Sequence, residues 1–144
     1  MAGQAAASGI RFFLDRGLGA RIVPQALRQA GWTLETMDER YGPTESQKVP
    51  DTKWIEEASL AGDVLLGKDL AIARNTLEAQ VVYMTSARAF GLSKAALTGP
   101  DMAQWYLVTE EKIVAAAIGA KGPYVMAVNP SYGLRRLKLA YPPK

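Results

Sequence analysis

The stretch Ile10-Arg11-Phe12-Phe13-Leu14-Asp15 decides the fold class of this 144-residue chain. Its apolar run is short, almost continuous and closed by an aspartate, which is typical of a strand buried on both faces of a parallel sheet. Val64-Leu65-Leu66-Gly67-Lys68-Asp69 repeats the pattern. Ligands of open α/β sheets bind at the carboxyl ends of the strands. We therefore expect Asp15 and Asp69 to lie together at that edge.

The remaining segments alternate between helical and strand-like patterns. Apolar residues recur at helical spacing in 18–30, 51–62, 76–84 and 100–119. Strand-like runs occupy 32–37, 87–92, 124–128 and 134–139. The last two runs flank Asn129-Pro130-Ser131-Tyr132-Gly133, which is typical of a β-hairpin, whereas 38–50 lacks periodicity and is expected to be a mobile loop. The pattern predicts an α/β fold with a central, mostly parallel sheet and a C-terminal β-hairpin.

The composition excludes several kinds of site. The chain has no cysteine and no histidine, which rules out disulfides, thiol nucleophiles, Ser-His-Asp catalysis and the usual zinc sites. Hydrolysis would then depend on carboxylates, lysine, tyrosine, serine or a metal-bound water. The net charge of +3 permits an anionic partner but is too small to demonstrate one.

The length and the first residues bear on domain organisation. A chain of 144 residues has the commonest size of one domain, and 49% hydrophobic residues suffice to cover both faces of a sheet. Residues 1–9 are small and lack the basic and apolar regions of a signal peptide, so we expect a flexible tail followed by a single domain over 10–144. No apolar run approaches the roughly 18 residues of a membrane span. We expect a soluble, cytoplasmic protein.

The order of these motifs resembles the PIN-like domain superfamily, and most closely the compact VapC-type toxins of bacterial toxin–antitoxin operons. The matching stretches are Arg11-Phe12-Phe13-Leu14-Asp15-Arg16-Gly17-Leu18-Gly19, Pro50-Asp51-Thr52-Lys53-Trp54-Ile55, Val64-Leu65-Leu66-Gly67-Lys68-Asp69-Leu70-Ala71-Ile72 and Ala87-Arg88-Ala89-Phe90-Gly91-Leu92. The resemblance implies a three-layer α/β/α domain and a ribonuclease whose acidic cluster binds Mg²⁺ or Mn²⁺. On this sequence that role passes to Asp15, Asp51 and Asp69.

The resemblance also implies further residues and partners. A fourth acidic ligand is expected, with Asp38 as first candidate and Glu56 as second. Independently of the resemblance, Arg16 and Lys68 each adjoin an aspartate in the sequence, so either could hold the scissile phosphate or balance the acidic cluster. Lys68 ranks above Arg16 and is also assigned to catalysis, and Arg74 is the third expected contact to the substrate. The implied partners are RNA, with tRNA among the candidates, and an antitoxin protein. A homo-oligomer is left open, and no membrane partner is expected.

The aspartates also have a purely structural interpretation. Asp51 can serve as the cap of a helix, and Asp15 and Asp69 as turn residues, because aspartate is common where a strand meets a loop. Their occurrence at successive strand and helix ends favours a site. Arg135, Arg136 and Lys138 fit either a solvated strand edge or a patch that faces RNA.

Two other functions remain open at this point. A receiver-like phosphoacceptor module also gathers aspartates and a lysine around Mg²⁺ at strand ends, but it needs an acidic pair after its first strand, and here Arg16 follows Asp15. A PIN-like fold that has lost catalysis and only binds RNA or a partner is the second alternative. Metal binding and a nuclease assay discriminate among the three.

Overall fold

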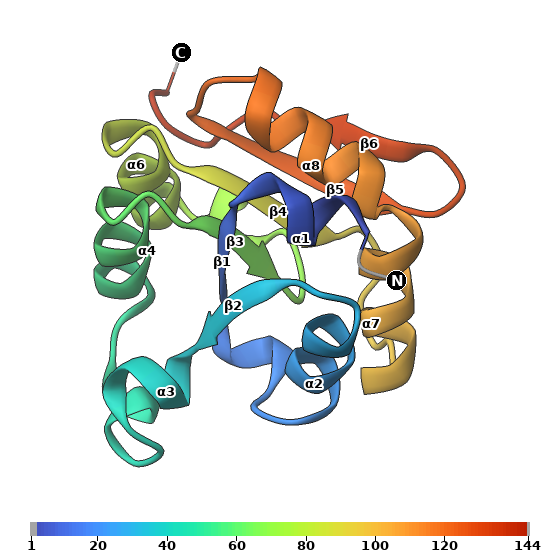
Figure 1. The fold of residues 1–144 in the computed structure, drawn as a ribbon. Helices are drawn as coiled ribbons and strands as arrows, with labels where there is room; N and C mark the ends of the chain where they lie inside the picture. Colours follow the sequence, from blue (N-terminus) through green and yellow to red (C-terminus); the bar gives the residue numbers. More distant parts are fainter. Residues whose placement is uncertain (1–2, 144) are drawn as a thin grey trace.

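The computed structural model describes residues 3–143, and its centre is one six-stranded sheet (Figure 1). The strands are β1 (Arg11–Leu14), β2 (Thr33–Thr36), β3 (Val64–Gly67), β4 (Arg88–Leu92), β5 (Tyr124–Asn129) and β6 (Gly133–Arg136). Their order is β2-β1-β3-β4-β5-β6, and every neighbouring pair is parallel except β5 and β6. The predicted α/β class, with a mostly parallel sheet and a C-terminal hairpin, is confirmed.

Helices cover both faces of this sheet. The first face carries α1 (Gln4–Ser8), the 3₁₀ turn η1 (Arg16–Leu18), α2 (Ile22–Gln29), α7 (Gly99–Val108) and α8 (Glu110–Gly119). The second face carries α3 (Met37–Tyr41), α4 (Asp51–Leu60), α5 (Ala71–Arg74) and α6 (Thr76–Met84), and a second 3₁₀ turn, η2 (Glu45–Lys48), follows α3. The three-layer arrangement matches the fold expected from the motif order. None of the helices described in residues 3–143 has the length and apolar character needed to cross a bilayer.

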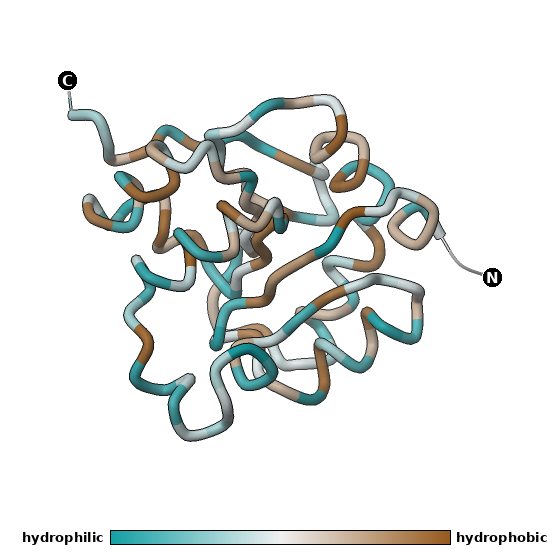
Figure 2. Tube along the Cα trace, turned by 60° about the vertical axis from the view of Figure 1, so that its left-hand side comes forward, coloured by the Kyte–Doolittle hydropathy of each residue, from teal (hydrophilic) through white to brown (hydrophobic). Residues whose placement is uncertain are grey.

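Alternate residues of β1, β3, β4 and β5 enter two separate hydrophobic cores. Phe12 and Leu14 belong to the cluster on the first face, while Phe13 between them belongs to the cluster on the second. All three side chains have no exposed surface, which explains the continuous apolar run of this strand. Figure 2 shows hydrophobic stretches of the trace running through the interior between the layers.

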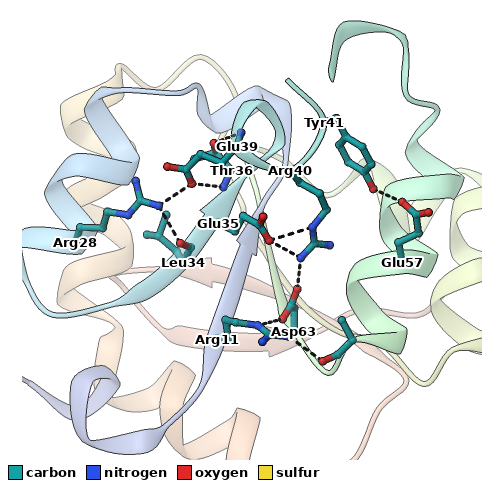
Figure 3. Close-up of polar contacts among 11 residues, drawn as sticks. Arg11, Arg28, Leu34, Glu35, Thr36, Glu39, Arg40, Tyr41, Glu57 and Asp63 are labelled. Carbon is teal, nitrogen blue, oxygen red and sulfur yellow. Dashed lines mark hydrogen bonds and ion pairs between the residues drawn. The ribbon is translucent and has the colours of Figure 1, made fainter. Parts of the chain in front are cut away.

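A buried carboxylate closes the edge of the sheet at which β1 and β3 begin (Figure 3). Asp63 is 2% exposed, and its two oxygens accept hydrogen bonds from Arg11 Nε at 2.5 Å and from an Arg40 terminal nitrogen at 2.8 Å. Arg40 also binds Glu35 at 2.6 Å and lies 4.2 Å from the centroid of the Phe13 ring. This network joins β1, β2, α3 and the start of β3.

The N-terminal segment differs from the flexible tail expected for 1–9. Residues Gln4–Ser8 form α1, which contacts α8. Ala5 is 2% exposed, and its N–H donates to the Glu110 carboxylate at 2.8 Å. The physical reason is that small alanines allow a short helix to dock closely, and this helix ends at Gly9, whose φ of 73° favours glycine. Residues 1–2 lie outside the described part of the chain.

Two other local predictions are wrong. The segment 38–50 is not a mobile loop but contains most of α3 and all of η2. Thr36 caps α3 in a capping box, because its hydroxyl accepts from the Glu39 N–H while the Glu39 carboxylate accepts from the Thr36 N–H. The long helix expected over 100–119 is two helices, since Thr109 interrupts it with φ −104° and ψ 6°.

We predict that Asp63→Asn lowers the free energy of unfolding by about 2 kcal/mol, because it leaves two arginines without the carboxylate that they share. Urea denaturation checks this. Glu45→Gln is the matched control: Glu45 pairs with Lys48 at 3.6 Å on the surface, and its loss should cost less than about 0.5 kcal/mol. Equal midpoints for the two variants would show that the network around Asp63 adds nothing to stability.

Candidate functional site

An acidic pocket of about 190 Å³ lies at the carboxyl ends of β1 and β3, on the side of α4 and α6. Its charged lining residues are Asp15, Arg16, Asp51, Lys68, Asp69 and Glu78. Five of these were predicted from the sequence, and the six together come from four separate segments of the chain: the end of β1, α4, the end of β3 and α6. We call this site the acidic pocket.

Asp15 is fixed at the end of β1 by backbone donors. Its two carboxylate oxygens accept from the Gly17 N–H at 2.6 Å and from the Lys68 N–H at 3.3 Å. Burial raises the pKa of Asp15 to about 6, and the nearby charge of Asp69 adds to the shift, while the two backbone hydrogen bonds oppose it. Asp15 is thus a half-buried carboxylate that becomes protonated at a higher pH than an ordinary aspartate.

Asp69 follows β3 and approaches the sheet very closely. Its carboxylate accepts from the Ala71 N–H at 2.9 Å and so holds the first turn of α5. A Cβ on Gly91 would lie 2.1 Å from the Asp69 carbonyl oxygen, and a Cβ on Gly67 would lie 3.1 Å from the Asp15 carboxylate. Glycine at these two strand positions is therefore what lets the acids lie over the sheet.

Asp51 is the first residue of α4 and is held by two donors. One carboxylate oxygen accepts from Trp54 Nε1 at 2.9 Å and from an Arg16 terminal nitrogen at 3.4 Å. Arg16 also donates to the backbone carbonyls of Ser46 and Val49. The predicted phosphate ligand Arg16 is therefore engaged with the protein, where it joins η1 to η2 and to α4.

Glu78 is the acid of the pocket that the sequence interpretation missed. Burial and the charges of Asp51, Asp69 and Asp15 all raise the pKa of Glu78, so its carboxylate is close enough to interact electrostatically with each predicted acid. The signal in the sequence is Asn75-Thr76-Leu77-Glu78, in which Asn75 caps α6 by accepting from the Glu78 N–H at 3.0 Å. In a capping box the Glu78 carboxylate would also accept a hydrogen bond from the Asn75 N–H. That bond is not made in residues 3–143, so helix capping does not explain the position of the Glu78 carboxylate.

Three predicted residues lie outside the acidic pocket. Asp38, the first candidate for the fourth acid, accepts a hydrogen bond from the Ser46 hydroxyl at 2.6 Å and lines a separate cavity of about 100 Å³. That cavity adjoins the pocket only through Arg16, which lines both. Glu56 is an exposed residue of α4, and Arg74 is an exposed residue at the end of α5. The pocket does not include any of the three among its lining residues.

The donor set of the pocket suits a hard divalent cation. Mg²⁺ and Mn²⁺ prefer carboxylate and water oxygens, and the pocket offers four carboxylates without nitrogen or sulfur ligands. Within residues 3–143, however, no three acidic side chains converge closely enough to hold one ion. Asp51 is turned to Arg16 and Trp54 instead. The structure thus gathers the predicted acids without closing them around a single ion position.

Comparison with known proteins identifies the family. A family described as "PIN like domain" matches residues 10–94, which contain Asp15, Asp51, Asp69 and Glu78. A protein of Mycobacterium tuberculosis (strain ATCC 25618 / H37Rv) named "Putative ribonuclease VapC45" is 41% identical over 125 residues, which cover 87% of this chain and 90% of that protein. No solved structure matches the chain. The chain belongs to the PIN-like domain family, and the resemblance to VapC-type proteins is confirmed.

We predict that the metal-free protein gains stability from Asp15 as the pH falls from 7 to 5. The pKa of Asp15 is about 6 in the folded state against an ordinary 3.8, so the folded state binds the proton first and is favoured as the pH falls. The gain from this group is about 1 kcal/mol over that range. Asp15→Asn should remove it, as measured by urea denaturation in EDTA at both pH values.

Asp101→Asn serves as the control for this measurement, because Asp101 is an exposed acid in the first turn of α7. It should keep the pH dependence of the wild type. The same pH dependence in Asp15→Asn would contradict the assignment of the raised pKa to Asp15.

Proposed function

We propose that this PIN-like protein is a metal-dependent endoribonuclease that acts as the toxin of a toxin–antitoxin pair. The observation that carries the proposal is that Asp15, Asp51, Asp69 and Glu78 line one pocket at the carboxyl ends of β1 and β3. The alignment with the mycobacterial relative covers most of both chains, and the name of that relative, a putative ribonuclease, supports RNA hydrolysis as the reaction. The expected cofactor is Mg²⁺ or Mn²⁺.

Phosphodiester hydrolysis fits the chemistry of these side chains. A bound divalent cation would lower the pKa of its water and offset charge on the phosphoryl oxygens. Asp15 and Asp69 would hold it from the strand ends, where backbone N–H groups fix both carboxylates. Glu78 would contribute a third carboxylate from α6. Lys68 lines the same pocket and would bind a non-bridging oxygen of the scissile phosphate.

The helical acid Asp51 and its partner Arg16 form an adjustable part of this site. Arg16 contacts Asp51 at 3.4 Å and lines the pocket, so its guanidinium would meet a substrate phosphate once this long contact was exchanged. We assign Arg16 to positioning Asp51 and to a contact with that phosphate. Arg74, exposed on α5, would contact the backbone further along the strand. Asp38 is replaced by Glu78 as the fourth acid.

The proposed partners follow from the same pocket. RNA with unpaired bases can present a phosphate to a half-buried pocket more easily than a regular duplex, and tRNA loops are substrates of this kind. An antitoxin that inserts an arginine or lysine among the carboxylates would silence the activity by taking the place of the cation. With these partners, the protein would act in the cytoplasm.

The two alternative functions make different predictions. The receiver-like alternative requires an acidic pair after β1, but Arg16 occupies the second position and binds Asp51. Membership of the PIN-like family also argues against it. The inactive alternative predicts RNA binding without hydrolysis, so the nuclease assay below separates it from the proposal.

Asp69→Asn should reduce RNA cleavage by about 100-fold or more while leaving the fold intact. The asparagine oxygen can still accept from the Ala71 N–H, but the negative charge offered to a cation is lost. We would measure cleavage of a tRNA pool with Mn²⁺ and with EDTA, and Mn²⁺ binding by titration calorimetry. Asp101→Asn is the control and should behave as wild type. Cleavage that persists in EDTA or in Asp69→Asn would overturn the proposal.

The identity of the fourth acid can be tested by three matched substitutions. Glu78→Gln should weaken Mn²⁺ binding by at least about tenfold, because it removes a charge that faces the other three acids. Asp38→Asn and Glu56→Gln remove one charge outside the pocket, so they should leave the affinity unchanged. If Asp38→Asn weakened binding more than Glu78→Gln, the metal would lie nearer to α3 than proposed.

A further inference from the structure

The two arginines of the edge strand β6 face opposite sides of the sheet. Arg136 pairs with Met126, whose side chain belongs to the core of the first face, and the Arg136 guanidinium lies 5.3 Å from the Tyr124 ring of the same core. Arg135 pairs with Ala127, which belongs to the core of the second face. Arg135 is therefore on the side of the sheet that carries the acidic pocket.

Arg135 also lies in the same lateral row of the sheet as this pocket. The strand register defines the row as Gly67, Gly91, Ala127 and Arg135. Asp15 and Asp69 lie over its two glycines, as the close approach of their oxygens shows. Neighbouring strands are about 4.8 Å apart, so the row spans about 14 Å from the pocket to β6.

The hairpin turn before Arg135 is held at the edge of the sheet where the pocket opens. Asn129 ends β5 and donates to the Ser93 hydroxyl at 2.9 Å, which ties the turn to the end of β4. The Tyr132 N–H donates to the Asn129 carbonyl at 3.2 Å. Because β3, β4 and β5 are parallel, their carboxyl ends lie at one edge, and the hairpin extends from that edge at the right of Figure 1.

Arg135 and Tyr132 form a flat, positively charged surface at this position. The Arg135 guanidinium carbon lies 4.2 Å from the centroid of the Tyr132 ring, so one face of the guanidinium rests on the phenol. Tyr132 is half-buried and Arg135 is exposed, which leaves the other face of the guanidinium in solvent. No carboxylate pairs with Arg135 in the described part of the chain.

We propose that the Arg135–Tyr132 pair is a second nucleotide-binding position for the RNA, where one unpaired base stacks on the free face of the Arg135 guanidinium. Unpaired bases stack on arginine planes and on aromatic rings in RNA complexes. At the 3.4 Å rise per nucleotide of a stacked strand, about 14 Å corresponds to about four nucleotides from the scissile phosphate, and to fewer in an extended strand. The inference rests on the proposed ribonuclease function.

Binding to single-stranded RNA gives the first test. Fluorescence anisotropy would follow a labelled RNA of about 12 nucleotides in EDTA, so that no metal-dependent cleavage occurs. Arg135→Ala should weaken binding by about tenfold, the value of one stacked base. Arg136→Ala is the matched control, because it removes the same charge from the next exposed residue on the opposite face, and it should weaken binding less than about twofold. Arg135→Lys should bind RNA nearly as weakly as Arg135→Ala, because lysine keeps the positive charge but lacks the planar guanidinium on which a base stacks.

Cleavage of RNAs of different length gives the second test. Wild type should cleave substrates that extend about four nucleotides beyond the scissile bond faster than shorter ones, mainly through a lower KM. Arg135→Ala should cleave both at the same rate, with kcat close to that of wild type at saturation. Arg136→Ala should keep the length dependence. A thermal melt of each variant confirms that the hairpin is folded.

The outcomes separate this inference from the ribonuclease proposal. Equal losses in Arg135→Ala and Arg136→Ala would show an effect of net charge and overturn the stacking position. An acidic peptide that binds more tightly than RNA, with the same dependence on Arg135, would assign the surface to a protein partner and overturn it as well. If wild type bound RNA through Arg135 but did not cleave it, the ribonuclease proposal would fail while the binding position stood.

Discussion

The close approach of the Asp69 backbone to the sheet is the constraint on which the acidic pocket depends. A Cβ on Gly91 would come within 2.1 Å of the Asp69 carbonyl oxygen, a distance that no neighbouring side chain could relieve because the contact is with backbone. The constraint at Gly67 is milder, because a Cβ there would lie 3.1 Å from the Asp15 carboxylate, which is a side-chain contact. These two glycines bring two acids from separate strands over one patch of the sheet, where burial and mutual repulsion raise the pKa of Asp15.

A carboxylate lies at each end of the sheet, and the two have opposite kinds of partner. At the amino ends of the strands, Asp63 is shared by Arg11 and Arg40, so its charge is neutralised inside the protein. At the carboxyl ends, the half-buried Asp15 lies beside Asp69, and the hydrogen bonds that it accepts within residues 3–143 come from backbone N–H groups. The first arrangement stabilises the fold, whereas the second leaves negative charge to be offset by a ligand, at a cost in stability.

Buried strands and their closing aspartates could be predicted, because continuous apolar runs and chain order are local properties of the sequence. Glu78 could not be predicted, since its sequence position, three residues after the cap Asn75, is that of a capping-box partner, and only the packing of α6 brings it to the pocket. Asp38 was misplaced because the Thr36 capping box begins a helix that directs it to Ser46. The metal-binding roles of all these acids stay predictions.

The acidic pocket combines a rigid half with an adjustable half. Backbone N–H groups fix Asp15 and Asp69 at strand ends, so these two carboxylates can move little. Asp51 is held by side chains, and its contact with Arg16 at 3.4 Å is long enough to be exchanged for a cation at small cost. No three acids converge in the described residues, so a third carboxylate would reach an ion bound to the strand pair only if a helical acid moved toward it. Asp15 and Asp69 at the strand ends would then determine the position of the ion, and Asp51 of α4 and Glu78 of α6 would determine how tightly it binds.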